Sequence, residues 1–195
     1  EQQKNKGFIE NLKRRGIPLK FLEESIDTYK SESEAEKIIK QDVVKFIKSP
    51  KNKMLIMCGE NGTGKTHLGT AIIRELGGVY INSFKFGVEY EMGGAFDAKK
   101  NRLDILDYYS RVKVLVIDEV GRGKVDFEKE VLPYIINQRY ENNLPTVIIT
   151  NFPKKEIVKY FGKAIFDRMT EICTCIEFTG KSYRATNRDK IFSEK

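Results

Sequence analysis

The sequence predicts an α/β protein in which a parallel five-stranded sheet lies between helices. Three observations support this fold class. Short apolar segments typical of buried strands recur along the chain, at residues 53–58, 79–81, 112–120, 146–150 and 172–178. Segments with the apolar spacing of helices lie between them, which favours parallel pairing of the strands. A glycine-rich loop and a helix follow the first strand directly, so the loop lies at the carboxyl end of that strand.

Length and composition are those of one globular domain. The chain has 195 residues, 40% of them hydrophobic and 32% charged, which is enough for one substantial core. The net charge of +7 allows a polyanion partner such as nucleic acid, or simply favours a nucleotide. No run approaches the ~18 apolar residues of a membrane helix, and Cys58, Cys173 and Cys175 lack metal-ligand spacing. We therefore expect a cytoplasmic protein with reduced core thiols and no membrane partner.

The chain ahead of the first strand contains a lead-in and a helix. Residues 1–16 are polar and basic, and we expect them to be a flexible lead-in or the remnant of an N-terminal region. The folded domain is then expected over residues 17–195. The chain begins with neither Met nor an apolar signal segment, so we expect it to be a fragment of a longer protein. Ser33 and Glu36 form a capping box before an amphipathic helix that we expect to end near Ser49.

The loop after the first strand fits the Walker A pattern G-x-x-x-x-G-K-[ST] at every fixed position, with Gly59, Glu60, Asn61, Gly62, Thr63, Gly64, Lys65 and Thr66. Such glycines let successive backbone N–H groups point at an anion. Lys65 is predicted to reach the β- and γ-phosphates, and the Thr66 hydroxyl to bind Mg²⁺. The N-terminus of the helix that follows the loop carries a partial positive charge, which also favours a bound phosphate. His67, the single histidine, adjoins this nucleotide site, and we expect it to be a positional residue of the helix.

Two further strands end in polar residues. Asp118 and Glu119 close an apolar strand, and the carboxyl ends of parallel strands face the crevice where ligands bind. Asp118 is predicted to hold Mg²⁺, directly or through water, and Glu119 to polarise the water that attacks the γ-phosphate. Asn151 ends the next strand. It is predicted to orient the same water or contact the γ-phosphate, and the alternative is a cap for the helix after Pro153.

The remaining segments are less informative. Residues 82–111 show only a weak helical period, whereas residues 126–140, 154–161 and 163–171 are expected to be helices. A cation beside the γ-phosphate offsets charge in the transition state, but spacing alone makes Arg168 and Arg184 ordinary surface residues. One group of residues fits either a track for single-stranded nucleic acid or a solvated helix face: Lys85, Lys99, Lys100, Arg102, Tyr108, Tyr109, Arg111 and Lys113.

The order of five segments, GENGTGKTHL, VLVIDEVG, LPYIINQRYENNLPTVIITN, FDRMTE and GKSYR, resembles the DnaC/DnaI family of bacterial and phage helicase loaders. The resemblance covers about residues 14–186. Members of that family are P-loop ATPases of the AAA+ class, and the transposition helper IstB is a close relative. The resemblance implies that Asn151 is the sensor-1 residue, that Arg168 is an arginine finger offered to a neighbouring subunit's ATP, and that Arg184 is sensor 2. It also implies contact with single-stranded DNA through roughly residues 82–110.

The family pattern is not matched everywhere. Gly162, Lys163 and Ala164 stand where relatives often have Gly-Glu-Arg, so one basic side chain is lost. The acidic pair is Asp-Glu where many relatives have Asp-Asp, which favours hydrolysis. Only 11 residues follow Arg184, which leaves no room for a large C-terminal lid.

The resemblance implies a Mg²⁺-dependent ATPase that loads a replicative DNA helicase onto single-stranded DNA, with subunits associated head to tail through ATP. An IstB-like transposition helper shares nearly all of these motifs. A P-loop nucleotide kinase and a non-hydrolysing ATP-dependent binding module are the alternatives from other classes. The Asp118–Glu119 pair with a following strand-end Asn argues against the kinase.

Overall fold

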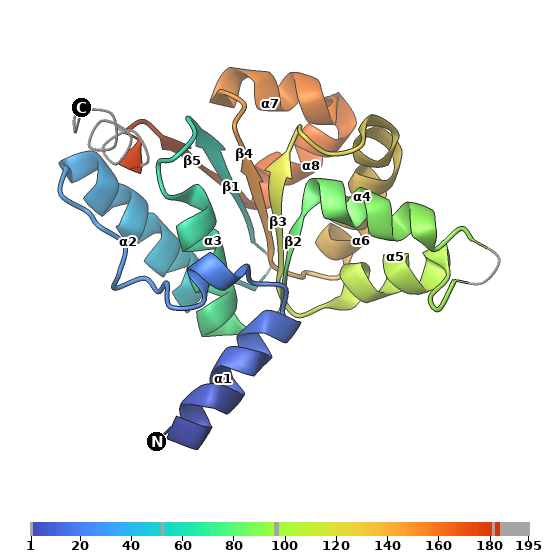
Figure 1. Cartoon of the computed structure of the whole chain (residues 1–195). Coiled ribbons are helices and arrows are strands. Elements are labelled where there is room, and N and C mark those ends of the chain that lie inside the picture. The colour runs from blue at the N-terminus through green and yellow to red at the C-terminus, as the bar shows by residue number, and fades with distance from the viewer. Residues whose placement is uncertain (1, 52, 96–97, 181, 184–195) are drawn as a thin grey trace, which may run out of the picture.

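The computed structural model describes residues 2–51, 53–95, 98–180 and 182–183 (Figure 1). Its centre is a parallel sheet with the strand order β2-β3-β4-β1-β5, which confirms the predicted five-stranded parallel sheet. The strands are β1 (Met54–Gly59), β2 (Val79–Asn82), β3 (Leu115–Val120), β4 (Thr146–Thr150) and β5 (Cys173–Phe178). The strand order reverses beside β1, so the loop after β1 opens into the crevice that such a switch point creates.

Helices cover both faces of the sheet (Figure 1). The described elements are α1 (Gln2–Arg14), η1 (Leu19–Phe21), α2 (Glu34–Lys48), α3 (Lys65–Leu76), α4 (Ser83–Met92), α5 (Arg102–Arg111), η2 (Phe127–Val131), α6 (Leu132–Glu141), α7 (Lys154–Phe161) and α8 (Lys163–Ile172). None of the helices in the described residues is long and apolar enough to cross a membrane.

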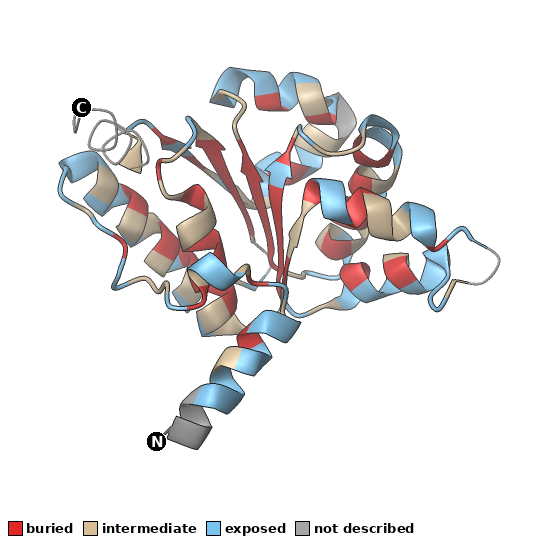
Figure 2. Ribbon diagram, viewed as in Figure 1, coloured by how far each residue is buried: buried red, intermediate tan, exposed pale blue. Residues whose placement is uncertain are grey.

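Each face of the sheet has its own core, and Figure 2 shows that the strands between them are largely buried. Successive strand residues point to opposite faces. Leu55 and Met57 pack with α1, α2 and α3 in one core, whereas Met54 and Ile56 pack with α4 to α8 in the other. The near-continuous apolar composition of the strands follows from burial on both sides.

The lead-in differs from the flexible segment expected over residues 1–16. Residues 2–14 form helix α1, and Leu12 on this helix is fully buried. The backbone after the helix lies against strand β2, because the N–H of Tyr80 donates to the carbonyl oxygen of Arg15 at 2.8 Å. Gly16 follows with a φ of +84°, and a Cβ there would meet the carbonyl oxygen of Tyr80 at 2.1 Å. The apolar residues of this helix, Phe8, Ile9 and Leu12, stand among polar and basic ones, which made the signal too weak to predict this contact.

Helix α4 is the element that sequence periodicity missed. It begins directly after β2 because the Asn82 side chain accepts hydrogen bonds from the N–H groups of Phe84 and Lys85, at 3.0 and 3.3 Å, as an N-cap residue does. The predicted helix over 126–140 is also divided. Pro133 lies in the first turn of α6, and a π-helical turn, η2, precedes it.

One arginine is fully buried among these helices. Arg139 of α6 donates to Thr146 Oγ1 at 2.9 Å and to the carbonyl oxygens of Tyr109, Val112 and Pro145 at 2.9, 2.9 and 2.7 Å. Burial lowers the pKa of its guanidinium to about 9, which leaves it charged at neutral pH. The side chain therefore joins the end of α5 and the start of β4 through charge-assisted hydrogen bonds.

Candidate functional site

The glycine-rich loop of residues 59–66 joins β1 to α3, as its sequence predicts. Gly62 and Gly64 adopt φ values of +80° and +93°, where other residues are strained. Neither has room for a side chain, because a Cβ at Gly64 would meet the Tyr29 ring at 2.6 Å and one at Gly62 would meet Ser182 Oγ at 2.1 Å. The glycine-rich loop is therefore in close contact with Tyr29, from the segment before β1, and with Ser182, from the segment after β5.

Lys65 begins helix α3 and is largely buried. Its ammonium group donates to the carbonyl oxygens of Gly59 and Glu60, at 2.8 and 2.5 Å. Thr63 also donates to the Glu60 carbonyl, at 2.8 Å. The positive charge thus lies inside the loop, at the positive end of the helix dipole, where an anion is favoured.

Asp118 receives three hydrogen bonds at the end of β3. The hydroxyls of Thr66 and Tyr80 donate to Oδ2 at 2.8 and 2.6 Å, and the Glu119 N–H donates to Oδ1 at 2.7 Å. Burial raises the pKa of Asp118, while the hydrogen bonds from Tyr80 and Thr66 act in the opposite direction. A hydroxyl and a carboxylate side by side at a phosphate loop fit Mg²⁺, which takes few protein oxygens and completes its shell with water and phosphate.

Glu119 lies at a β-bulge. Ile117 pairs with Ile148 and Val120 with Thr150, so two residues of β3 face one residue of β4. Bulges re-aim side chains, often beside active sites. Glu119 has a φ of +58°, a conformation that costs about 1–2 kcal/mol for a residue with a Cβ. Its exposed carboxylate is held by Asn82, whose Nδ2 donates to Oε2 at 2.5 Å.

Sequence reasoning missed Tyr80 and Asn82, which hold the two carboxylates. The available signal was their place on a strand next to β3, since Asn82 is paired with Asp118 in the parallel register. Polar residues at the end of a strand that neighbours β3 are expected to lie close to Asp118 and Glu119. The contacts join residues 37 and 38 positions apart, so no local pattern reveals them.

A cavity of about 1160 Å³ lies above these residues. Its wall includes much of the predicted site, namely Asn61, Gly62, Gly64, Lys65, Thr66, His67, Asp118, Glu119 and Asn151. The wall also includes residues from two other segments, ten residues between Lys20 and Glu36 ahead of β1, and Thr179, Gly180 and Tyr183 after β5. Tyr183 links these two segments, because its hydroxyl donates to Glu36 Oε1 at 2.6 Å and its N–H donates to the Gly62 carbonyl at 3.0 Å.

His67 joins helix α3 to the lead-in wall of the cavity. Its Nε2 lies 2.8 Å from the Ser25 carbonyl oxygen, and its Nδ1 lies 3.2 Å from Glu24 Oε2. The ring also meets the edge of Tyr29, with centroids 5.6 Å apart. These contacts fit the predicted role of a positional residue.

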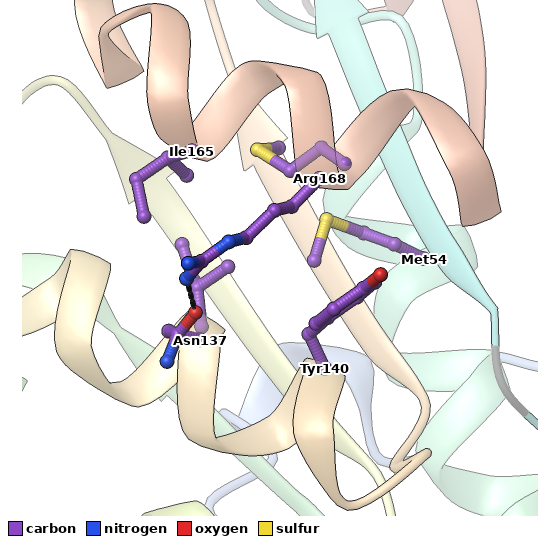
Figure 3. Close-up of a pocket in the computed structure, with 7 residues that line it drawn as sticks. Met54, Asn137, Tyr140, Ile165 and Arg168 are labelled. Atoms are coloured by element: carbon purple, nitrogen blue, oxygen red, sulfur yellow. Dashed lines mark hydrogen bonds between the residues drawn. The ribbon is translucent and has the colours of Figure 1, made fainter.

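Arg168 lies apart from the cavity. It is exposed on α8, and its guanidinium points toward α6, where it donates to Asn137 Oδ1 (Figure 3). Met54, Tyr140 and Ile165 line the same small hollow. Arg168 is not among the residues that line the cavity of about 1160 Å³. The predicted sensor residue Arg184 lies outside the described residues.

The basic residues predicted to track a nucleic acid strand are exposed, and some of them make contacts within the chain. Lys100 lies over the Tyr108 ring at 5.3 Å, and Arg111 pairs with Asp107 at 2.6 Å. Tyr109 is buried, with its hydroxyl donating to Glu89 at 2.7 Å. It packs inside the protein and is therefore a wrong choice for stacking on a base.

A family model described as "IstB-like ATP binding protein" matches residues 6–191. The chain belongs to this family. Among curated relatives of this IstB-like protein, the replicative helicase loader DnaC of Escherichia coli K12 is 33% identical over 119 residues, 58% of this chain and 49% of the relative. The putative ATP-binding protein of insertion sequence IS232 from Bacillus thuringiensis subsp. berliner is 30% identical over 158 residues, 75% of this chain and 63% of the relative. The chain thus spans about half the length of the DnaC loaders that it matches.

Solved structures share the fold of this IstB-like protein. The DnaC helicase loader superimposes with a TM-score of 0.71 at 20% identity, covering 83% of this chain and 100% of that one. DnaI superimposes with a TM-score of 0.66 at 22% identity, and the match covers 87% of this chain and 98% of the DnaI chain. AMPPCP-bound DnaA from Aquifex aeolicus superimposes with a TM-score of 0.62 at 20% identity, and the match covers 88% of this chain and 56% of the DnaA chain. The fold is that of the AAA+ P-loop domains, as the sequence resemblance implies.

Proposed function

We propose that this chain binds ATP with Mg²⁺ in the cavity above residues 59–66 and hydrolyses it to ADP and phosphate. The observation that carries the proposal is the convergence of Lys65, Thr66, Asp118, Glu119 and Asn151 on one cavity at the carboxyl ends of β1, β3 and β4. Membership of an ATP-binding family supports ATP as the nucleotide. A strand-end carboxylate beside a phosphate loop supports hydrolysis.

Each side chain takes one role in this proposal. Lys65 neutralises the β- and γ-phosphates, and Thr66 with Asp118 holds Mg²⁺. When bound, Mg²⁺ would polarise the phosphoryl oxygens and offset their charge. Glu119 polarises the attacking water, and Asn151 orients it. The hydrogen bond from Asn82 keeps the Glu119 carboxylate at the mouth of the cavity. To reach the water, the Glu119 side chain must either break this hydrogen bond or move together with the Asn82 side chain.

The cation for the γ-phosphate comes, in this proposal, from a neighbouring subunit. Arg168 is exposed and lies outside the cavity of its own chain, which supports a role as a finger in trans. We predict that Lys65→Ala abolishes ATP binding and that Arg168→Ala abolishes turnover while ATP affinity stays within about threefold. The measurements are equilibrium binding of a fluorescent ATP analogue and steady-state phosphate release.

Mixing the two variants tests the trans arrangement directly. An Arg168→Ala subunit keeps a complete cavity, and a Lys65→Ala subunit keeps the finger. The mixture should therefore recover turnover that neither variant has alone. Arg111→Ala is the matched control, because Arg111 is an exposed arginine paired only with Asp107 among the contacts of the described chain. Undiminished turnover by Arg168→Ala at saturating protein, or a mixture as inactive as its parts, would reject the finger.

We propose that ATP turnover serves the loading of a replicative DNA helicase onto single-stranded DNA in the cytoplasm. The DnaC relatives support this proposal, and a DnaA neighbour was solved with single-stranded DNA. The IS232 relative favours a second candidate, an IstB-like transposition helper. Pull-down of the full-length protein with a replicative helicase and with a transposase, each with and without ATP, separates the two. Phosphoryl transfer to a nucleoside would instead support the nucleotide kinase, the weakest alternative.

A further inference from the structure

Glu128 is a buried carboxylate that none of the roles above uses. It lies in the π-helical turn η2 and is 5% exposed. Its Oε1 accepts from the N–H groups of Gly121 and Gly123, at 3.1 and 3.0 Å, and from the Ser83 hydroxyl. Its Oε2 accepts from the Gly121 N–H at 3.1 Å and from the Tyr160 hydroxyl. One side chain therefore binds three separate elements: α4, the loop after β3, and α7.

The loop after β3 is shaped to admit this carboxylate. Gly121 has a φ of +94°, and a Cβ on it would meet the Phe152 ring at 2.4 Å. A Cβ on Gly123 would meet Glu128 Oε1 at 2.5 Å and Ser83 Oγ at 2.6 Å. Gly121 thus allows the backbone conformation that this loop needs, and Gly123 leaves the space that the Glu128 carboxylate occupies.

The backbone route from Glu128 to Glu119 is short. Gly121 lies two residues after Glu119, and the Arg122 N–H donates to the Glu119 carbonyl at 3.0 Å. Between them, the Val120 carbonyl accepts from Thr150 Oγ1 at 2.8 Å. Glu119 itself has the left-handed φ of +58°, which persists only where the surroundings fix it. The bonds from Gly121 and Gly123 to Glu128 fix the loop immediately after it.

A second route runs through side chains. The Ser83 hydroxyl, fully buried, donates to Glu128 at the first turn of α4. The residue before it, Asn82, caps α4 and donates to Glu119 Oε2 at 2.5 Å. Glu128 therefore contacts both the loop that directly follows Glu119 and the first turn of α4, which Asn82, the partner of the Glu119 side chain, caps.

We propose that Glu128 is a positioning residue for Glu119. It holds the loop after β3 and the start of α4 so that the Glu119 carboxylate stays at the mouth of the cavity. The inference rests on the proposed hydrolysis by Glu119, and its structural part is measurable without hydrolysis. Glu128 acts through backbone N–H groups and a hydroxyl, so acceptor oxygen at this place matters more than negative charge.

Three variants test the proposal. Glu128→Leu removes both acceptors at similar volume, and Glu128→Gln keeps one acceptor for the glycine N–H groups while its amide donates to the Tyr160 hydroxyl. Glu130→Gln is the matched control, an exposed carboxylate in the same turn. We expect Glu128→Leu to lower kcat about tenfold or more, because misplacing a catalytic group is costly, with KM and ATP affinity within about threefold of wild type. Glu128→Gln should restore kcat to within about threefold.

Amide hydrogen exchange of residues 119–123 gives the second measurement. Glu128→Leu should speed exchange in this loop in the folded protein, whereas Glu128→Gln and Glu130→Gln should leave it protected. In Gly123→Ala the added methyl group displaces the Glu128 carboxylate, so this variant should show the same loss of kcat. It tests the proposal if Glu128→Leu does not fold. Wild-type turnover and loop protection in folded Glu128→Leu or Gly123→Ala would overturn the proposal. So would a Glu128→Gln protein as impaired as Glu128→Leu. If the wild type shows no turnover, the proposed hydrolysis fails, and loop exchange still decides whether Glu128 holds the loop.

Discussion

Replacing the buried arginine of α6 with methionine tests how the helical layer is joined to the sheet. Arg139→Met keeps an unbranched side chain of similar length but removes every guanidinium donor. Thr146 Oγ1 still donates to the Leu144 carbonyl at 3.2 Å, and the Pro145 carbonyl still accepts from the Leu115 N–H at 3.2 Å.

The carbonyls of Tyr109 and Val112 each lose a charged donor at 2.9 Å. A hydrogen bond to a charged group contributes about 1.5 kcal/mol or more, so the two losses amount to about 3 kcal/mol. For a domain of this size, about 3 kcal/mol corresponds to a fall in Tm of about 6–12 °C. Methionine also removes the cost of burying a charge, which reduces the expected loss.

The assay is urea and thermal unfolding followed by circular dichroism, without nucleotide, because a bound ligand would add its own stabilisation. Arg111→Met is the control. Its side chain is 77% exposed, and we expect a change within about 0.5 kcal/mol. A loss below about 1 kcal/mol for Arg139→Met would refute the reasoning, because it would mean that the cost of burying the charge cancels its hydrogen bonds.

Two further predictions concern the cavity. Tyr80→Phe removes the 2.6 Å hydrogen bond to Asp118, so the pKa of Asp118 should rise further and Mg-ATP affinity should fall about tenfold, the equivalent of ~1.4 kcal/mol. Titration with ATP in Mg²⁺ and in EDTA measures this, and equal losses in both would contradict a role at the metal. The Tyr183 hydroxyl holds the pKa of Glu36 below its usual 4.5, so the stability that Glu36 contributes is complete above that pH and is lost as pH falls through the lowered pKa. Glu36→Gln should therefore be less stable than wild type at pH 7 and approach it in acid, and a difference that is constant across an unfolding series in pH would contradict this.

Much of the fold could be predicted because its signals are local. The apolar strands, the glycine loop and the cap at Ser33 each occupy one short window of sequence, and the structure has a strand, a loop or a capping box at each of them. Helix α4 was missed because its apolar residues show no clear helical period and because its N-cap, Asn82, is also the last residue of β2. The burial of Leu12 was missed because the helix around it is polar.

The candidate site divides in the same way. Lys65, Thr66 and Asp118 lie in motifs, so sequence could bring them together on the cavity, although their roles remain predictions. No motif marks Tyr80 or Glu128, because their partners are 38 and up to 45 residues away, and for Tyr80 the one signal was its place on the strand beside β3. Tyr109 was misassigned because a tyrosine among basic residues looks the same whether its ring is buried or exposed.

The place of Arg15 beside β2 has a consequence for how the chain behaves in solution. Strand β2 is one edge of the sheet, and an open edge invites pairing with another chain. The Arg15 carbonyl accepts from the N–H of Tyr80, and Gly16 lies so close to β2 that a Cβ on it would meet the Tyr80 carbonyl oxygen, so this part of the edge is covered. A chain shortened to begin at residue 17 would retain every nucleotide motif yet present a bare edge. We therefore expect residues 2–16, which carry no motif, to protect this edge against pairing with another chain.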